Sequence, residues 1–218
     1  MTEKHTILKN VRLIDAAAGR TDACDIHFVR RDKSSEILRI GRNLRAEEID
    51  GLSVVNVHGA QACPPFTDLR CAAPDGEREL MKTVLFAANA GGYGTVLLHP
   101  TSTASADSKS ALLEQKKAAL AANECEVCAA VPVTKGGKGQ RLCDFSELKK
   151  AGAVAVTDEC EENDCSSGKL LDCLEAVERE NLLFLASCRR KSIDARGSVN
   201  KGKMSAYFGD RGIDSTSE

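Results

Sequence analysis

The chain has 218 residues, and its 30 lysines and arginines against 32 aspartates and glutamates give a formal net charge of −2. With 42% hydrophobic and 28% charged residues, the composition is typical of a globular protein with a buried core. The balanced charge, the 4% aromatic content and the lack of tryptophan argue against a nucleic-acid-binding protein. Because the sequence has neither an apolar leader nor a run of 18 apolar residues, we expect a cytoplasmic protein that does not bind membranes.

The first part of the chain, 1–59, predicts a small β domain. Short apolar or alternating runs at 6–14, 24–29, 37–40 and 53–57 are typical of strands, and turn-forming or polar residues separate them. No helix of useful length fits between these runs. We therefore expect an all-β unit here.

From 60 to 218 the pattern changes to alternating strands and helices. Strands are expected at 66–70, 94–99, 126–134, 153–157 and 182–187, and helices at 77–89, 106–123, 145–150 and 169–180. The strands start every 27 to 32 residues, which indicates βα units and a parallel sheet. Five such units suit either an open doubly wound sheet or part of a (β/α)₈ barrel, so the fold class is α/β.

Two of the expected helices carry apolar side chains at helical spacing, which we expect to lie on one face of each helix; in an incomplete barrel such faces would lack part of their cover. These side chains are Leu112, Leu113 and Leu120 in the helix at 106–123, and Leu170, Leu171, Leu174 and Val177 in the helix at 169–180.

Glycine-rich stretches occur at 91–94 and 135–139, but neither forms the phosphate-binding glycine pattern of a first βα turn. The first stretch precedes a strand, where no helix N-terminus could hold a phosphate. The second follows a strand, so it could be a phosphate cradle or a flexible basic loop, and we favour the loop.

Ten cysteines are spread along the chain without regular spacing. Without an export signal we expect reduced thiols, most of them acting as small buried apolar side chains. Only Cys125 and Cys128 form a close pair, and a zinc ribbon would need a second such pair.

Five stretches, in chain order, are similar to the motifs of one enzyme family. They are ILKNVRLID at 7–15, PFTDL at 65–69, AGGYGTV at 90–96, TKGGKG at 134–139 and VNKGKMSA at 199–206. Together they resemble the dihydroorotases of the cyclic amidohydrolase superfamily. The resemblance implies a partial (β/α)₈ TIM-type barrel of about five βα units, over 60–218, preceded by the small β domain at 1–59.

Dihydroorotases open or close a cyclic amide with zinc held by histidine and aspartate side chains at the barrel mouth, and the resemblance places those positions here. Its His-x-His motif corresponds to Arg70 and Ala72, a substrate-contacting asparagine to Thr101, and a later histidine to Ser187. Only Asp158 stands where the family has a metal-bridging aspartate. We therefore expect no zinc or other cofactor and no intact catalytic or substrate-binding residue.

Arg70 is more disruptive than a missing ligand, because a guanidinium has no lone pair for a metal and carries a fixed positive charge. We consider two arrangements: Arg70 pairs with Asp158 across the barrel mouth, or both charges stay solvated. His99 ends the second barrel strand, and we expect an ordinary hydrogen-bonded histidine there.

The family's sixth to eighth strands, with a further ligand and the general base, do not follow within the sequence. We therefore expect a non-catalytic dihydroorotase-like protein of pyrimidine biosynthesis that acts as a structural partner of aspartate carbamoyltransferase or associates with itself. One alternative is an active amidohydrolase with a relocated metal site built from Cys71, His99, Asp158 and Cys188. Another is a gene fragment without function.

Overall fold

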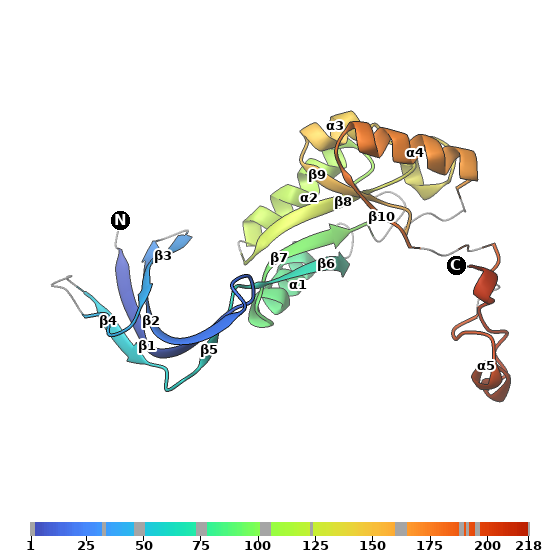
Figure 1. The fold of residues 1–218 in the computed structure, drawn as a ribbon. Helices are drawn as coiled ribbons and strands as arrows, with labels where there is room; N and C mark the ends of the chain where they lie inside the picture. The colour runs from blue at the N-terminus through green and yellow to red at the C-terminus, as the bar shows by residue number, and fades with distance from the viewer. Residues whose placement is uncertain are drawn as a thin grey trace. The chain divides into compact units, whose positions relative to one another are not determined.

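The computed structural model describes residues 3–31, 34–45, 51–72, 78–100, 106–122, 124–159, 165–187, 190, 192–194 and 197–217. Contacts between residues divide the chain into two compact units, Met1–Pro65 and Phe66–Glu218 (Figure 1). Among the described helices, none is both long enough and apolar enough to cross a membrane.

The first unit is a small β-sheet. Its strands are β1 (Lys4–Asp15), β2 (Arg20–Arg31), β3 (Ser34–Gly41), β4 (Ser53–Asn56) and β5 (Gln61–Ala62). The order is β3-β2-β1-β4, with β1, β2 and β3 antiparallel and with β4 and β5 both parallel to β1. Ile7, Val11, Ile26 and Val29 are buried in β1 and β2, and Val11, Cys24 and Ile26 form the apolar cluster of this unit.

The second unit contains a five-stranded parallel sheet, as the sequence predicts. Its strands are β6 (Phe66–Ala72), β7 (Tyr93–His99), β8 (Glu126–Pro132), β9 (Ala153–Thr157) and β10 (Leu183–Leu185). They pair in the order β10-β9-β8-β7-β6, and every pairing is parallel. This arrangement is the first part of a (β/α)₈ barrel.

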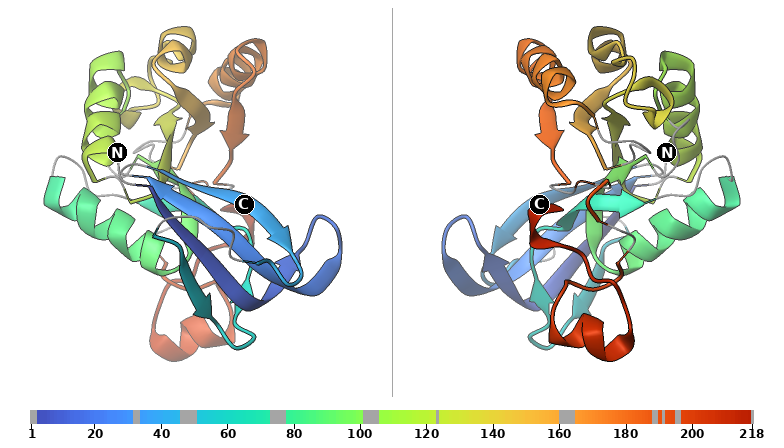
Figure 2. Two further views of the ribbon diagram at one scale, coloured as in Figure 1. Left: turned by 90° about the vertical axis from the view of Figure 1, so that its left-hand side faces the viewer. Right: turned by 90° about the vertical axis from the view of Figure 1, so that its right-hand side faces the viewer.

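Helices connect the strands of this sheet and lie around its outer face (Figure 2). They are α1 (Arg78–Ala90), α2 (Lys109–Ala122), α3 (Phe145–Lys150) and α4 (Ser167–Arg179); the 3₁₀ turn η1 (Lys135–Gly137) follows β8. A short helix, α5 (Lys203–Phe208), and the 3₁₀ turn η2 (Ser215–Ser217) lie beyond β10. Side chains cap the N-termini of α3 and α4: Asp144 accepts a hydrogen bond from the Glu147 amide, and Ser166 accepts one from the Lys169 amide.

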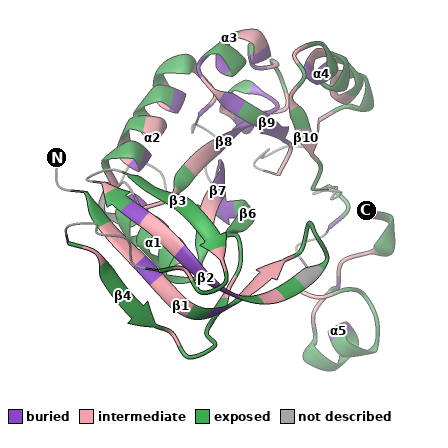
Figure 3. Cartoon of the chain, turned by 60° about the vertical axis from the view of Figure 1, so that its left-hand side comes forward, coloured by how far each residue is buried: buried purple, intermediate pink, exposed green. Residues whose placement is uncertain are grey.

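The main apolar core lies between the strands and the helices (Figure 3). Leu112, Leu148, Val131 and Val156 are fully buried there. A second cluster under α1 and α2 includes Leu85 and is continuous with the face of β6 and β7. Both clusters fill the space between the sheet and the helices that cover it, as expected for a close-packed protein core.

The expectation that Leu112, Leu113 and Leu120 share one face of their helix is wrong. In α2, Leu112 is buried but Leu113 is 46% and Leu120 77% exposed, and Ala119, seven residues after Leu112, completes the buried stripe instead. A seven-residue step returns to almost the same side of a helix, whereas the adjacent residue lies about 100° away. In α4, Cys173 and Val177 face the core, and Leu171 and Leu174 are exposed.

Candidate functional site

The site lies at the carboxyl ends of the parallel strands, where α/β barrels carry their chemistry. Arg70 lies near the end of β6, His99 is the last residue of β7, and Asp158 and Glu159 directly follow β9. Ser187 comes two residues after β10. Because the strands are parallel and in sequential order, their carboxyl ends lie on the same side of the sheet, and these residues lie there together.

Arg70 forms an ion pair with Glu159. Its Nε donates to Oε2 at 3.0 Å, and its Nη2 contacts Oε1, which makes the pair bidentate. Two strands lie between β6 and β9, so in a flat sheet their backbones would be about 14 Å apart. The curvature of the sheet and the length of the arginine side chain close this distance.

The ion pair shifts the pKa values of both groups in opposite directions. The hydrogen bond from Arg70 is the largest cause that holds the pKa of Glu159 below its usual value, and it outweighs the effect of burial. Glu159 in turn raises the pKa of Arg70. The Arg70 side chain is 73% exposed, so solvent weakens the attraction between the two charges.

His99 joins the same cluster from β7. It is 6% exposed, its Nδ1 lies 3.1 Å from Oε2 of Glu159, and its Nε2 lies 2.9 Å from the backbone carbonyl oxygen of Leu69. A carbonyl oxygen only accepts, so Nε2 is the donor in that bond. Both ring nitrogens therefore face oxygen acceptors, and His99 is the ordinary hydrogen-bonded histidine that we expected.

Asp158 has a different partner from the one we considered. Its Oδ1 accepts a hydrogen bond from the backbone amide of Ser187 at 2.7 Å, and this bond ties the end of β9 to the segment after β10. Arg70 pairs with Glu159, the next residue, and not with Asp158. The two residues lie in the bend and turn that follow β9, and only Glu159 meets the guanidinium.

These residues do not fit a zinc ion. Zinc needs three or four nitrogen, sulfur or carboxylate ligands converging at about 2.0–2.3 Å. No group of three histidine, cysteine, aspartate or glutamate side chains suited to a metal occurs within the described parts of the chain. At this edge the guanidinium of Arg70 already neutralises the carboxylate that could have attracted a cation.

The relocated metal site also finds no support in the geometry. Cys71 is buried in the cluster under α1 with Met81 and Leu85, and burial raises the pKa of its thiol, so it is held as a neutral apolar side chain. Both nitrogens of His99 are engaged. Cys188 and the family position Thr101 lie outside the described residues.

The glycine-rich loop after β8 uses its amides internally. Gly136 donates to Oδ2 of Asp107 at 3.0 Å, Gly139 to Oγ1 of Thr134 at 2.9 Å, and Gly137 to the Thr134 carbonyl oxygen. Gly136 has φ +65°, a conformation that favours glycine. These three amides already have acceptors within the chain, which favours the interpretation as a loop over a phosphate cradle.

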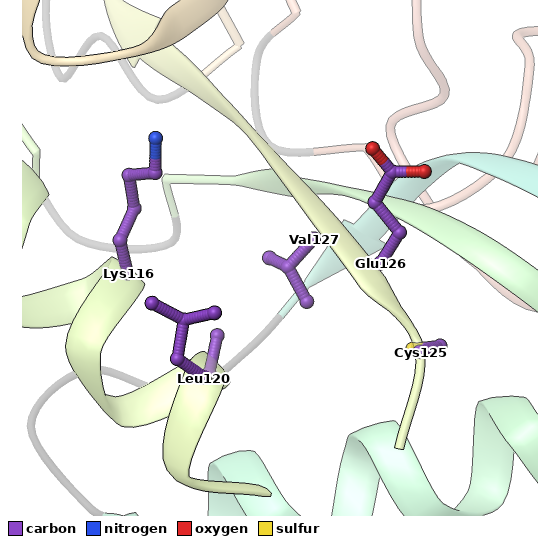
Figure 4. A pocket seen from close by; sticks show the side chains of 6 residues that line it. Lys116, Leu120, Cys125, Glu126 and Val127 are labelled. Atoms are coloured by element: carbon purple, nitrogen blue, oxygen red, sulfur yellow. The ribbon is translucent and has the colours of Figure 1, made fainter. Parts of the chain in front are cut away.

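A small pocket of about 170 Å³ lies between α2 and the start of β8, away from the strand ends (Figure 4). Leu120, Val127 and Cys125 give it an apolar lining, and Lys116 and Glu126 lie at its border. Burial raises the pKa of Cys125, so its thiol is a poor nucleophile. Of the eight described cysteines, four are buried, three are partly buried and Cys63 is exposed, so burial is confirmed for half of them and not for most.

Comparison with known proteins shows which protein family the chain belongs to. Residues 65–218 match the dihydro-orotase-like protein family. The chain belongs to this family. The dihydroorotase of Geobacillus sp. (strain WCH70) is 30% identical over 185 residues, which cover 84% of this chain and 43% of that protein. The dihydroorotase of Caldicellulosiruptor saccharolyticus is 25% identical over 212 residues, covering 95% and 47%.

Solved structures agree on the fold. The L-hydantoinase (dihydropyrimidinase) from Arthrobacter aurescens superposes with a TM-score of 0.64 at 19% identity, covering 86% of this chain and 41% of that one. A D-hydantoinase gives 0.58 at 17% identity. This dihydro-orotase-like chain thus spans less than half the length of the curated dihydroorotases named above.

Glu159 is the site residue that sequence reasoning missed. It follows Asp158 directly after β9, and the resemblance drew attention to the aspartate alone. A signal was present, because a second carboxylate at the end of a barrel strand gives a fixed cation such as Arg70 a second possible partner.

Proposed function

We propose that this dihydro-orotase-like chain does not hydrolyse cyclic amides and acts as a structural protein of pyrimidine biosynthesis. The observation that carries the proposal is the bidentate pair of Arg70 with Glu159 at the strand ends. The family holds its zinc with a histidine at the position of Arg70, and this chain has a permanent cation there instead.

The chemistry of the three clustered side chains supports this proposal. A metal-dependent amidohydrolase needs a cation that polarises the amide carbonyl and activates a water molecule. Arg70 can donate hydrogen bonds but cannot lower the pKa of a bound water as zinc does. The ring nitrogens of His99 already contact Glu159 and the backbone carbonyl oxygen of Leu69. The cluster therefore connects β6, β7 and β9 mechanically.

The partner we propose is aspartate carbamoyltransferase, the enzyme that precedes dihydroorotase in the pathway. Exposed apolar side chains on α4 and β10 support an association of some kind: Leu171 is 58%, Leu174 40% and Leu183 63% exposed. An exposed strand edge with apolar neighbours tends to be covered by another protein surface. A second copy of this chain is the alternative occupant of that surface.

Sedimentation velocity of the chain mixed with purified aspartate carbamoyltransferase of the same source tests the proposal. We expect a complex at low micromolar concentration, and we expect Leu171→Ser with Leu174→Ser to weaken it at least tenfold. Leu120→Ser, which changes a more exposed leucine on α2, is the control and should leave the complex intact.

Two results would contradict this part of the proposal. The chain could sediment independently of the carbamoyltransferase at tens of micromolar. It could also form only homo-oligomers that the α4 substitutions disperse, which would assign the surface to self-association.

A further inference from the structure

The first unit holds a pair of histidines in direct contact on neighbouring strands. His5 lies on β1 and His27 on β2, and the register pairs Ile7 with His27 and His5 with Val29, so the two histidines are diagonal neighbours on one face. Nδ1 of His5 and Nε2 of His27 are 3.2 Å apart and share a hydrogen bond, whose proton a metal bound by both nitrogens would displace. The ring centroids are 5.4 Å apart, with the ring planes tilted by 47°.

This separation of the ring nitrogens suits a shared metal ion. Two nitrogens bound to one zinc at about 2.0–2.1 Å, with an angle between a right angle and the tetrahedral angle, lie about 2.9–3.4 Å apart. The observed distance falls within that range, so small rotations of the two rings would aim both lone pairs at one point. The strands that carry the rings are paired continuously from Lys4 to Leu8, which fixes their spacing.

A carboxylate lies behind one of the rings. Oε2 of Glu3 is 3.7 Å from Nε2 of His5, the nitrogen that does not face His27. Arg31 holds this carboxylate through a hydrogen bond from Nε to Oε1 at 2.8 Å. A histidine that binds a metal usually gives its other ring N–H to a carboxylate, which orients the ring and makes it a better ligand.

The charges around the pair are balanced. Arg31 also pairs with Glu36, and Arg39 is the cross-strand neighbour of His27. The two arginines and the two glutamates, Glu3 and Glu36, sum to zero, so no net positive charge opposes a cation there.

We propose that His5 Nδ1 and His27 Nε2 chelate a late first-row divalent cation, namely zinc, nickel or copper(II), with water completing its coordination. Imidazole nitrogen suits these metals, and it disfavours magnesium and calcium. Within the described residues no third side chain joins the two histidines as a ligand, so the affinity is that of a two-histidine chelate. The site lies in the first unit and is independent of the function proposed for the barrel edge.

Calorimetric titration of the full chain with nickel(II) tests the proposal. The parent should bind one nickel ion through this pair, and His5→Gln and His27→Gln should each lower the affinity at least tenfold, because either change leaves a single imidazole. His58→Asn is the matched control: His58 is an exposed histidine of the same unit, and asparagine tolerates its left-handed backbone. Its affinity should equal that of the parent.

The proposal is overturned if the parent binds no nickel, if either glutamine variant binds as tightly as the parent, or if His58→Asn weakens binding as much as they do. A proton NMR titration of the unmodified parent gives a second test that needs no variant. Substoichiometric nickel should broaden the Hε1 signals of His5 and His27 before those of His58 and His99. Broadening that starts elsewhere, for instance near the cysteines, would overturn the proposal.

Discussion

Val96, Val131 and Val156, in the interior of the parallel sheet, are fully buried, as the family fold requires, whereas the carboxyl ends of the same sheet carry side chains that the family chemistry does not use. Arg70 and Ser187 stand there at positions where the resemblance places histidines. A barrel scaffold depends on many apolar contacts that can be exchanged for one another. The chemistry of a barrel depends on a few groups that cannot be replaced. The apolar interior is therefore packed here although the strand ends carry other residues than those the resemblance implies.

The largest effect should come from a substitution in the interior. Leu112→Ala removes a side chain with no exposed surface, and we expect it to lower the free energy of unfolding by about 2–5 kcal/mol. Leu120→Ala on the same helix removes a side chain that is 77% exposed, and it should change stability by less than about 0.5 kcal/mol. Urea unfolding followed by circular dichroism measures both. Equal losses in the two variants would show that the packing of α2 differs from the one described.

A smaller loss of stability is expected on substitution of Asp25, a buried carboxylate of the first unit that accepts three hydrogen bonds. Lys9 Nζ donates to it at 2.8 Å, and the backbone amides of Asn10 and Leu44 donate at 3.1 and 2.9 Å. Burial raises the pKa of this carboxyl, but the three hydrogen bonds together outweigh burial and hold its pKa below the usual 3.8. Asp25→Asn should cost about 1.5–3 kcal/mol near neutral pH, because an amide NH₂ would then face other donors.

The sign of the pH dependence follows from that lowered pKa. The unfolded chain takes up the proton first as the pH falls, so the stability given by ionised Asp25 is complete well above pH 3.8 and is lost as the pH drops through the folded pKa. The difference in unfolding free energy between the parent and Asp25→Asn should therefore shrink below about pH 4. A difference that grows on acidification would contradict the hydrogen-bond assignment.

The smallest effect belongs to the ion pair at the strand ends. A double-mutant cycle with Arg70→Gln and Glu159→Gln should give a coupling energy of about 0–1 kcal/mol, since the arginine is largely exposed. High salt should reduce this coupling. A coupling above about 3 kcal/mol would mean that the pair is much better shielded from water than its exposure indicates.

Regular features of the fold could be predicted from the sequence. The recurrence of strands and helices predicted five parallel strands in sequential order, and the motifs at 65–69 and 90–96 predicted the family, because both depend on patterns repeated along the chain. Periodicity alone did not show which helix face is buried when leucines are adjacent. Either Leu112 or Leu113 could face the core, and the position of the helix on the sheet determines that Leu112 does.

The site was predicted less completely. The resemblance drew attention to Arg70, which stands where the family has a zinc-binding histidine, but it did not identify Glu159 as the partner of Arg70. Side-chain direction after β9 depends on how that strand ends, and the local sequence does not encode this by itself. The contact between His5 and His27 likewise depends on the register of β1 with β2, which the sequence left open.

The most direct test of the central claim is the rate of dihydroorotate hydrolysis by the purified parent chain with added zinc, beside an active dihydroorotase as positive control. Activity, and not zinc content, is the readout, because the His5–His27 pair is itself a proposed metal site. We expect no hydrolysis above the rate without protein, and also none for Arg70→His combined with Ala72→His. Zinc-dependent hydrolysis by the parent that His99→Gln abolishes would contradict it.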